Sequence, residues 1–314
     1  MKRNLILSGL ILAIAVIVPH RTLAAASPAP VDLKSAAHFT ILAGSAISFA
    51  APVNSTTNSG DIGTFPTPTI TGLGNLVLQG VDHAGDTVTQ KAKTDLANAY
   101  NDAAGRDATT FFTPIFDLGG LTLMPGVYND STSLGITGTL TLDAQGNSQA
   151  VWVFQVGSTL ITAPASTVVL TNGAQARNVF WQVGTSATLG TYSVFTGTIM
   201  AQTDITLTTG SMIMGGRALA QNGAATFDGN LITQPTPEAP QFIFISRTHP
   251  PFATVILSTT PFFLLTLKAC PDLLLTNWTT ITSDIPDTRL WTFTDTTATA
   301  DVTDRFYQAF ITSY

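Results

Sequence analysis

Short side chains that bear hydroxyl groups recur at a regular interval along the second half of this 314-residue sequence. Each lies in a short segment in which threonine alternates with a large apolar residue, as in Thr188-Leu189 and Thr206-Leu207. Because successive side chains of a strand point to opposite faces, the apolar residues are predicted to face inward and the threonines outward. The outward positions predicted in this way are Thr159, Ser186, Thr188, Thr206, Thr208, Ala224 and Thr226.

These side chains could act together as a surface. Strands stacked about 4.8 Å apart, with alternate residues about 6.6 Å apart along each strand, form a flat grid. Small hydroxyl and methyl groups suit a surface that orders water, although Ile161, Asp204 and Asp228 interrupt the grid. The alternative is that threonine is simply a favourable residue for an exposed strand. The low charge favours the first interpretation, because charged residues make up only 10% of the chain and solvated faces normally carry Lys and Glu.

Residues for catalysis are hard to find. The histidines His20, His38, His83 and His249 share no metal-ligand spacing, and the sequence has no Gly-x-Ser-x-Gly, no phosphate-binding Gly loop and no His-Glu-x-x-His. We therefore expect no catalytic residues, no metal and no cofactor. The charges of the repeat region occur singly and are interpreted as solvated, which disfavours a polysaccharide lyase or hydrolase: Asp143, Asp204, Asp228, Arg177 and Arg217.

A repeat positions the threonines. Apolar runs end on glutamine at Gln155, Gln182, Gln202 and Gln221, and the last two steps are 20 and 19 residues long. Such a period is typical of a solenoid, and apolar residues at both strand parities indicate that these runs are covered on both sides. We assign the glutamine-terminated run to the first strand of a coil, the threonine segment to the second, and segments such as 193–195 and 211–214 to the third.

One helix is predicted at residues 86–104, with Asp86 as N-cap and Gly105 as C-cap. Its apolar residues follow at helical spacing, so the helix is expected to lie along the glutamine-terminated face. The predicted buried stripe is Val88, Ala92, Leu96, Ala99, Tyr100 and Ala103.

The ends of the chain differ from its middle. Residues 1–26 carry Lys2 and Arg3, an apolar run and small residues, which predicts a secretory signal peptide and a secreted protein; the alternative is an uncleaved anchor.

We expect the solenoid at 27–234, a Pro-rich linker at 235–240 and a small antiparallel β module at 241–314. A net charge of -6 argues against a nucleic-acid partner, and the single Cys270 excludes a disulfide within the chain.

Several motifs occur together and in order: Phe39 to Ser45, Gly60 to Gly63, Ile70-Thr71-Gly72, Asn178 to Gly184, Ala187 to Thr191 and Arg217 to Gln221. With them, the region from about His38 to Thr233 resembles the microbial ice-binding proteins of the DUF3494 type, which are secreted by cold-adapted organisms.

The resemblance implies a mainly β fold, a discontinuous right-handed three-faced β-solenoid with one long helix packed alongside. It also implies an ice crystal surface as the partner, and that an N-terminal coil stacks beside the last one and brings Thr69 and Thr71 next to Thr226. The third-strand residues Ser193, Ser211 and Asn230 form the rival surface.

The C-terminal module resembles short β modules of bacterial surface proteins, through Leu275 to Thr279, Phe293-Thr294-Asp295 and Arg305-Phe306-Tyr307. It is interpreted either as a packing domain with Trp278 and Phe306 in its core or as an attachment module. The alternative function of the whole chain is therefore a structural or adhesive cell-surface protein that binds a cell wall or a polysaccharide.

Overall fold

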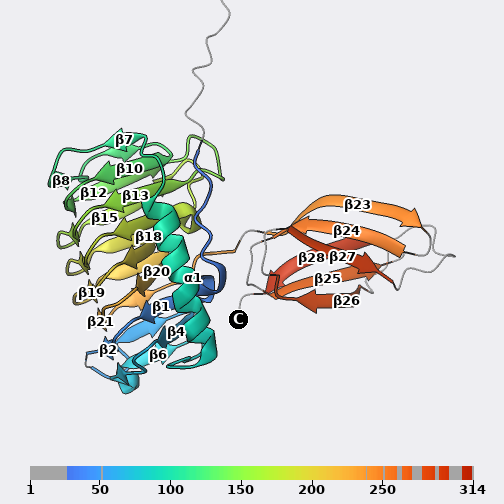
Figure 1. Ribbon diagram of the computed structural model, residues 1–314, viewed down its shortest axis with the longest axis horizontal. Coiled ribbons are helices and arrows are strands. Elements are labelled where there is room, and N and C mark those ends of the chain that lie inside the picture. The colour runs from blue at the N-terminus through green and yellow to red at the C-terminus, as the bar shows by residue number, and fades with distance from the viewer. Residues whose placement is uncertain are drawn as a thin grey trace, which may run out of the picture.

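The computed structural model describes residues 27–50, 52–237, 239–249, 252–259, 264–270, 278–286, 290–296 and 306–312. The predicted signal peptide lies outside these residues, as do Leu275 to Asn277 and Arg305. The described part forms a stack of parallel strands with one long helix beside it, followed by a separate set of antiparallel strands (Figure 1). Within the described ranges, no helix is long and apolar enough to cross a membrane.

The stack is a β-solenoid with three faces, as predicted. An eight-stranded parallel sheet makes one face, and a fourteen-stranded sheet makes the other two. The larger sheet bends at glycine, because β18 (Val194–Ala201) and β20 (Met212–Ala220) each continue from one face to the next. Gly197 has a φ of 101°, and a Cβ on Gly216 would lie 2.0 Å from the Gly197 carbonyl oxygen. The predicted first and third strands are therefore continuous at these corners.

We name the faces by what they carry. The helix face consists of β7 (Thr110–Phe111), β10 (Gly126–Asp130), β13 (Trp152–Val156), β16 (Val179–Val183), the second parts of β18 and β20, β1 (Phe39–Ala43) and β4 (Asp61–Thr64). The hydroxyl face is the eight-stranded sheet of β8 (Phe116–Asp117), β11 (Leu134–Ile136), β14 (Leu160–Thr162), β17 (Ala187–Leu189), β19 (Ile205–Leu207), β21 (Ala225–Phe227), β2 (Ile47–Phe49) and β5 (Ile70–Thr71). The third face consists of β9 (Thr122–Leu123), β12 (Thr139–Asp143), β15 (Thr167–Thr171), the first parts of β18 and β20, β22 (Leu231–Ile232), β3 (Thr56–Asn58) and β6 (Leu76–Leu78). Three short 3-10 helices complete the solenoid: η1 (Lys34–His38), η2 (Leu73–Asn75) and η3 (Ala176–Asn178).

The solenoid is discontinuous in sequence. β1 pairs in parallel with both β20 and β4, so the chain's N-terminal strands extend the stack beyond its last repeat. In Figure 1 these blue strands lie directly beside the orange strands of the last coil. Two N-terminal coils are present, one with β2 and one with β5, where the sequence suggested a single coil.

The core between the faces is apolar. The predicted inward residues Leu160, Leu189, Leu207 and Phe227 are all buried. Aromatic rings stack along the solenoid axis, with centroids 5.3 Å apart for Tyr128 and Phe154 and 3.9 Å apart for Phe154 and Trp181. Stacked parallel strands with such a core hold the outer side chains of each face at fixed spacings.

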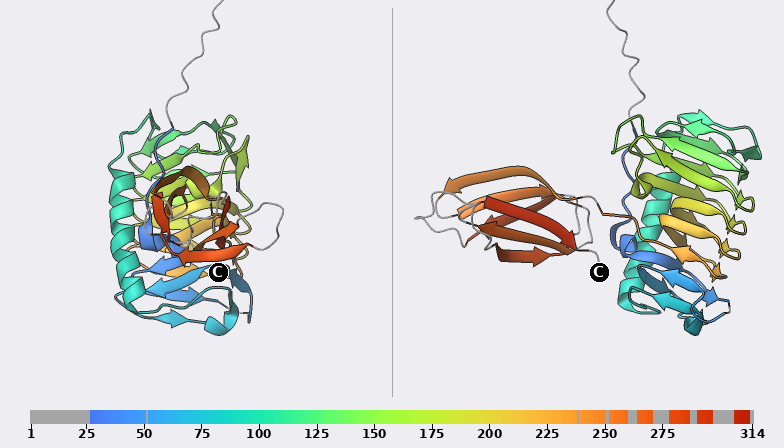
Figure 2. Two further views of the ribbon diagram at one scale, coloured as in Figure 1. Left: turned by 90° about the vertical axis from the view of Figure 1, so that its right-hand side faces the viewer. Right: turned by 180° about the vertical axis from the view of Figure 1, so that it is seen from behind.

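The helix α1 (Thr87–Ala104) covers the helix face and runs along one side of the solenoid (Figure 2). Asp86 is its N-cap and accepts a hydrogen bond from Thr89 N, and Gly105 is its C-cap. Ala92, Leu96, Ala99 and Ala103 pack against Val153, Phe180, Met200 and Leu219. Val88 was predicted to be buried and is 45% exposed, because Thr89 occupies the buried position in this first turn and donates to the His83 carbonyl.

Two of the four repeated glutamines bond to the helix or to a residue just after it. Gln155 Nε2 donates to the carbonyl oxygens of Ala103 and Arg106, at 2.9 Å and 2.7 Å, and so satisfies the C-terminal end of α1. Gln182 Nε2 donates to the Tyr100 hydroxyl over 2.8 Å. Gln155 and Gln182 thus fix the C-terminal half of α1 against the helix face.

The C-terminal strands form two antiparallel three-stranded sheets with a core of their own. The strands are β23 (Gln241–His249), β24 (Phe252–Ser258), β25 (Leu264–Cys270), β26 (Thr279–Asp284), β27 (Leu290–Asp295) and β28 (Phe306–Thr312). Val255, Leu257, Leu265, Leu267 and Trp291 are buried together. Trp278 and Phe306, placed in the core under the packing-domain interpretation, are only partly buried, whereas Trp291 is buried.

Candidate functional site

A continuous row of outward side chains crosses the hydroxyl face. Strand pairing aligns Thr188 with Thr206, Thr206 with Thr226, Thr226 with Ser48, and Ser48 with Thr71. Five neighbouring strands therefore present one hydroxyl each at the same level of the sheet. At about 4.8 Å per strand, the row is roughly 19 Å long.

Strand alternation explains why these hydroxyls face solvent. In β17, β19 and β21 the two outer residues of each strand are buried and the middle threonine is exposed or partly exposed. The buried neighbours, such as Ile205 and Leu207, belong to the apolar core. Turning a threonine inward would expose two core residues, so the register of the face is strongly specified.

A second outward row runs beside the first. Main-chain hydrogen bonds from Ile47 N to Thr69 O, Ile205 N to Ala224 O, and Leu160 N to Ser186 O place Thr69 beside Ala46, Ala224 beside Asp204, and Ser186 beside Thr159. Side chains in this region bond one another: Thr159 Oγ1 donates to Ser133 Oγ over 2.8 Å, and the hydroxyls of Ser186 and Thr203 are 2.7 Å apart. On the other side of the central row, Thr208 Oγ1 donates to Leu189 O.

The structure thus brings the sequence-predicted residues to one surface. Thr69, Thr71 and Thr226 are exposed, and the remaining six are partly exposed: Thr159, Ser186, Thr188, Thr206, Thr208 and Ala224. One expectation is wrong, because Thr71 does not neighbour Thr226. Ser48 lies between them, in the additional N-terminal coil. Sequence reasoning missed Ser48, although the apolar-Ser-apolar order of Ile47, Ser48 and Phe49 carries the same signal as the threonine segments.

The hydroxyl row ends towards β8. The next outward residues after Thr188 are Ile161, Gly135 and Asp117. Ile161 is 52% exposed. Asp117 Oδ1 accepts hydrogen bonds from Gly119 N and Thr137 N; burial raises the pKa of this carboxyl, but these hydrogen bonds lower it more, so its net pKa lies below the usual value. The central row of hydroxyl side chains therefore spans the strands from β5 to β17.

The two aspartates within the face are engaged by neighbouring groups. Asp204 Oδ1 accepts from Ala224 N over 2.8 Å, and Asp228 Oδ2 accepts from the Thr209 hydroxyl. Arg217, interpreted from sequence as a solvated charge, is buried: its guanidinium donates to the Ala37 carbonyl and to Thr198 Oγ1. Burial lowers the pKa of Arg217 to about 10.

The rival residues of the third face do not reach the surface. Ser193, Ser211 and Asn230 are 1%, 0% and 2% exposed. Asn230 Nδ2 donates to Thr208 O and Ser211 O, and Ser193 Oγ accepts from Thr162 Oγ1 over 3.2 Å. Ser211 and Asn230 satisfy main-chain groups at the solenoid corners, and all three side chains are buried, so the rival assignment is wrong for them.

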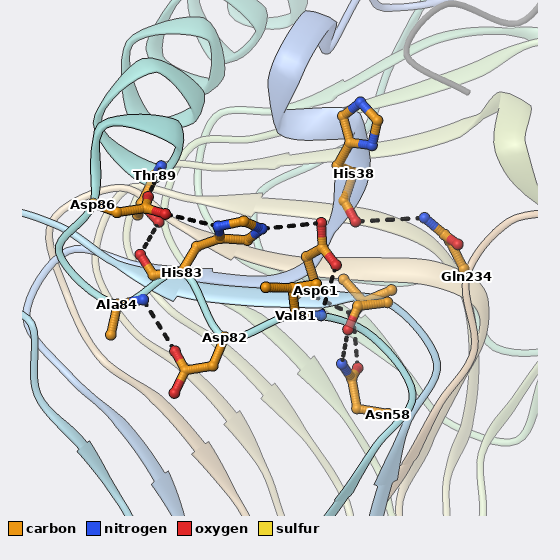
Figure 3. Close-up of polar contacts among 12 residues, drawn as sticks. His38, Asn58, Asp61, Val81, Asp82, His83, Ala84, Asp86, Thr89 and Gln234 are labelled. Atoms are coloured by element: carbon orange, nitrogen blue, oxygen red, sulfur yellow. Dashed lines mark hydrogen bonds and ion pairs between the residues drawn. The ribbon is translucent and has the colours of Figure 1, made fainter. Parts of the chain in front are cut away.

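A cluster of titratable side chains joins the helix to the N-terminal coils. The His83 ring lies between two carboxylates, with Nδ1 2.7 Å from Asp86 Oδ2 and Nε2 3.6 Å from Asp61 Oδ2 (Figure 3). Burial raises the pKa of Asp86, but the hydrogen bonds from Thr89 and His83 outweigh it and leave the net pKa below the usual value. In the described residues, no three His, Cys, Asp or Glu side chains are arranged to hold a metal ion.

Comparisons with known proteins find a matching family profile and several relatives of this chain. The sequence profile described as Ice-binding-like matches residues 41–233. A protein of Nostoc sp. (strain HG1) named ice-binding protein is 46% identical over 209 residues, which cover 67% of this chain and 76% of that protein. One from Colwellia sp., with the same name, is 39% identical over 231 residues, 68% of this chain and 87% of that protein.

Solved structures agree with the sequence relatives. The crystal structure of an ice binding protein from an Antarctic biological consortium superposes with a TM-score of 0.65 at 41% identity, and the match covers 68% of this chain and 95% of that one. The ice-binding protein from an Arctic yeast gives a TM-score of 0.59 at 29% identity, covering 68% of this chain and 98% of that one. The three-faced solenoid, its helix and the matched residues together show that this chain belongs to the Ice-binding-like family, whose members bind rather than catalyse.

Proposed function

We propose that this protein adsorbs to ice through the hydroxyl face and thereby inhibits the growth or recrystallisation of ice. The observation that carries the proposal is the continuous row from Thr71 through Ser48, Thr226 and Thr206 to Thr188 on one parallel sheet. Its relatives named ice-binding proteins support the ligand class.

The mechanism is interfacial. The hydroxyl and methyl groups hold water molecules at the spacing of the sheet, and these waters merge with the ordered water of the crystal surface. Rigidity favours this step, because ordering a loose surface on contact would cost roughly 1 to 2 kcal/mol per residue of backbone entropy. The buried neighbours Ile205, Leu207 and Phe227 supply that rigidity from below.

The direct test is to watch a single ice crystal in a dilute solution of the purified protein while the solution is slowly undercooled. The proposal predicts faceting and a temperature interval without growth. A crystal that grows as in buffer, with the protein folded by circular dichroism, would overturn it.

We also propose that the chain is secreted after removal of residues 1–26, and that residues 27–234 bind ice independently of the module at 241–314. The C-terminal strands have their own core and follow a Pro-rich segment, which supports a separable module. A chain that ends at residue 237 should shape ice as the full chain does. Loss of ice shaping by that folded chain would contradict independence and favour a role for the module in binding.

A further inference from the structure

The third face of the solenoid is an exposed sheet surface with an apolar centre. Strand pairing aligns Val194 with Met212 and Met212 with Leu231, so three large apolar side chains lie next to one another. Met212 is 36% exposed and Met214 38%. Threonines flank this centre on both sides, Thr167 beside Val194 and Thr57 beside Leu231.

The third face differs from the other two faces in its outward apolar side chains. On the helix face the outward apolar residues, such as Phe180 and Met200, are buried beneath α1. On the hydroxyl face the central outward positions of five neighbouring strands are small hydroxyl residues. Only on the third face do large outward apolar side chains form a row that no other described segment buries. A contiguous apolar row rimmed by polar residues marks an interaction surface.

We propose that two copies of this chain associate through their third faces, about a two-fold axis near Met212 and Leu231. A two-fold contact requires one surface to complement itself. An apolar centre with threonines on both sides meets this condition, because rotation places the apolar centre on the apolar centre and the threonines on the threonines. Such a surface has the apolar core and polar rim of a protein interface.

The distribution of charge also favours association of two copies through their third faces. The whole chain has a net charge of -6, so two copies repel each other over much of their surface. The row from Thr167 to Thr57 contains no charged residue, and the methionine side chains can adapt to a facing surface. Two acidic copies can therefore approach here without placing like charges in contact.

The area of the third face determines how strongly two copies can associate. Eight strands about 4.8 Å apart, with two outward positions about 6.6 Å apart on each, give a face of roughly 35 Å by 13 Å, or about 450 Å² per copy. The total, about 900 Å², is below that of a permanent dimer and suits a reversible one. The hydroxyl faces of both copies stay uncovered, so dimerisation and ice binding can fail separately.

Sedimentation equilibrium of the purified chain tests the proposal. The average mass should rise from that of one chain, which is 32.9 kDa with residues 1–26 included, towards twice the single-chain mass as the concentration reaches the high micromolar range. Met212→Lys should abolish this rise, because it buries a charge at the centre of the contact. Ile161→Lys is the matched control, since Ile161 is an exposed apolar residue in the middle of a strand on the hydroxyl face, and it should dimerise as the unmodified chain does. A monomer at every concentration, or equal dimerisation of Met212→Lys, would overturn the proposal.

Peroxide oxidation identifies what covers the face. Met212 and Met214 should be oxidised quickly in dilute protein and slowly in concentrated protein, whereas Met124, 55% exposed at the far end of the solenoid, should oxidise equally fast in both. Protection of Met212 at all concentrations would assign the face to the chain's own C-terminal module and contradict the proposal. Oxidation of Met212 at the same rate in dilute and concentrated protein, combined with lower ice activity of Met212→Lys, would assign the face to ice and contradict the proposal as well.

Discussion

The Ser48 hydroxyl donates a hydrogen bond to Thr226 Oγ1 over 3.4 Å, although 178 residues separate the two in sequence. Through this contact the hydroxyl row passes from the last repeat coil to the N-terminal coils. The candidate face is therefore assembled from both ends of the solenoid region, and Thr69 and Thr71 join it only because β2 lies between β21 and β5.

Ser48→Tyr should reduce thermal hysteresis as strongly as a change in the repeat threonines. The substituted side chain faces solvent, so the core residues Ile47 and Phe49 stay in place, but its ring stands above the plane of the hydroxyl row. Thr94→Tyr, at an exposed position of α1, is the control and should leave hysteresis unchanged. Equal hysteresis of Ser48→Tyr and the unmodified chain would remove the N-terminal coil from the ice-binding surface.

Asp86→Ala should lower the free energy of unfolding by about 1 kcal/mol, because it removes the side-chain cap of α1. Urea unfolding at neutral pH measures this cost, and Asp86→Ser, which keeps a cap, should recover most of it. The folded pKa of Asp86 is depressed, so its contribution is present at neutral pH and is lost as the pH falls through that lowered pKa. Equal stability of the Ala and Ser variants would show that the cap is not what stabilises this end.

Lys93 should make the free energy of unfolding depend on pH in the alkaline range. Its ammonium donates to the carbonyl oxygens of Ala220 and Gln221, and burial lowers the pKa of Lys93 to about 8, against 10.5 for an ordinary lysine. The unfolded chain holds this proton more tightly, so unfolding takes up a proton between these pH values. Lys93 therefore adds stability as the pH rises from about 8 towards 10.5, on the order of 2 kcal/mol in all, and adds none of it below pH 8.

Comparison with Lys93→Met isolates this contribution. Urea unfolding of both proteins at about pH 7.5 and about pH 10 gives the difference between their free energies of unfolding at each pH. That difference should shift in favour of the lysine form at the higher pH. A difference that stays constant would mean that the folded protein does not perturb Lys93.

Much of the architecture could be predicted from sequence because local patterns encode it. Asp86 and Gly105 mark the ends of α1, and the alternation around Leu189 and Leu207 fixes which side chains face inward. The glutamine repeat revealed the face under the helix, although not that Gln155 and Gln182 bond to it.

Features that depend on contacts distant in sequence could not be predicted in the same way. Neither the pairing of Ser48 with Thr226 nor the burial of Arg217 beneath the Ala37 carbonyl leaves a local trace. Ser193, Ser211 and Asn230 look like surface residues in sequence. All three are buried, and Ser211 and Asn230 satisfy main-chain carbonyl groups at the solenoid corners.

The most direct test of ice binding by the hydroxyl face is the thermal hysteresis of Thr206→Tyr and Thr226→Tyr, measured beside Thr94→Tyr and the unmodified chain at equal concentration. Both residues point outward, so all four proteins should melt at similar temperatures. The account predicts that the two face variants lose most of their hysteresis while the helix variant keeps it. Full hysteresis in both face variants, with their fold intact, would contradict it.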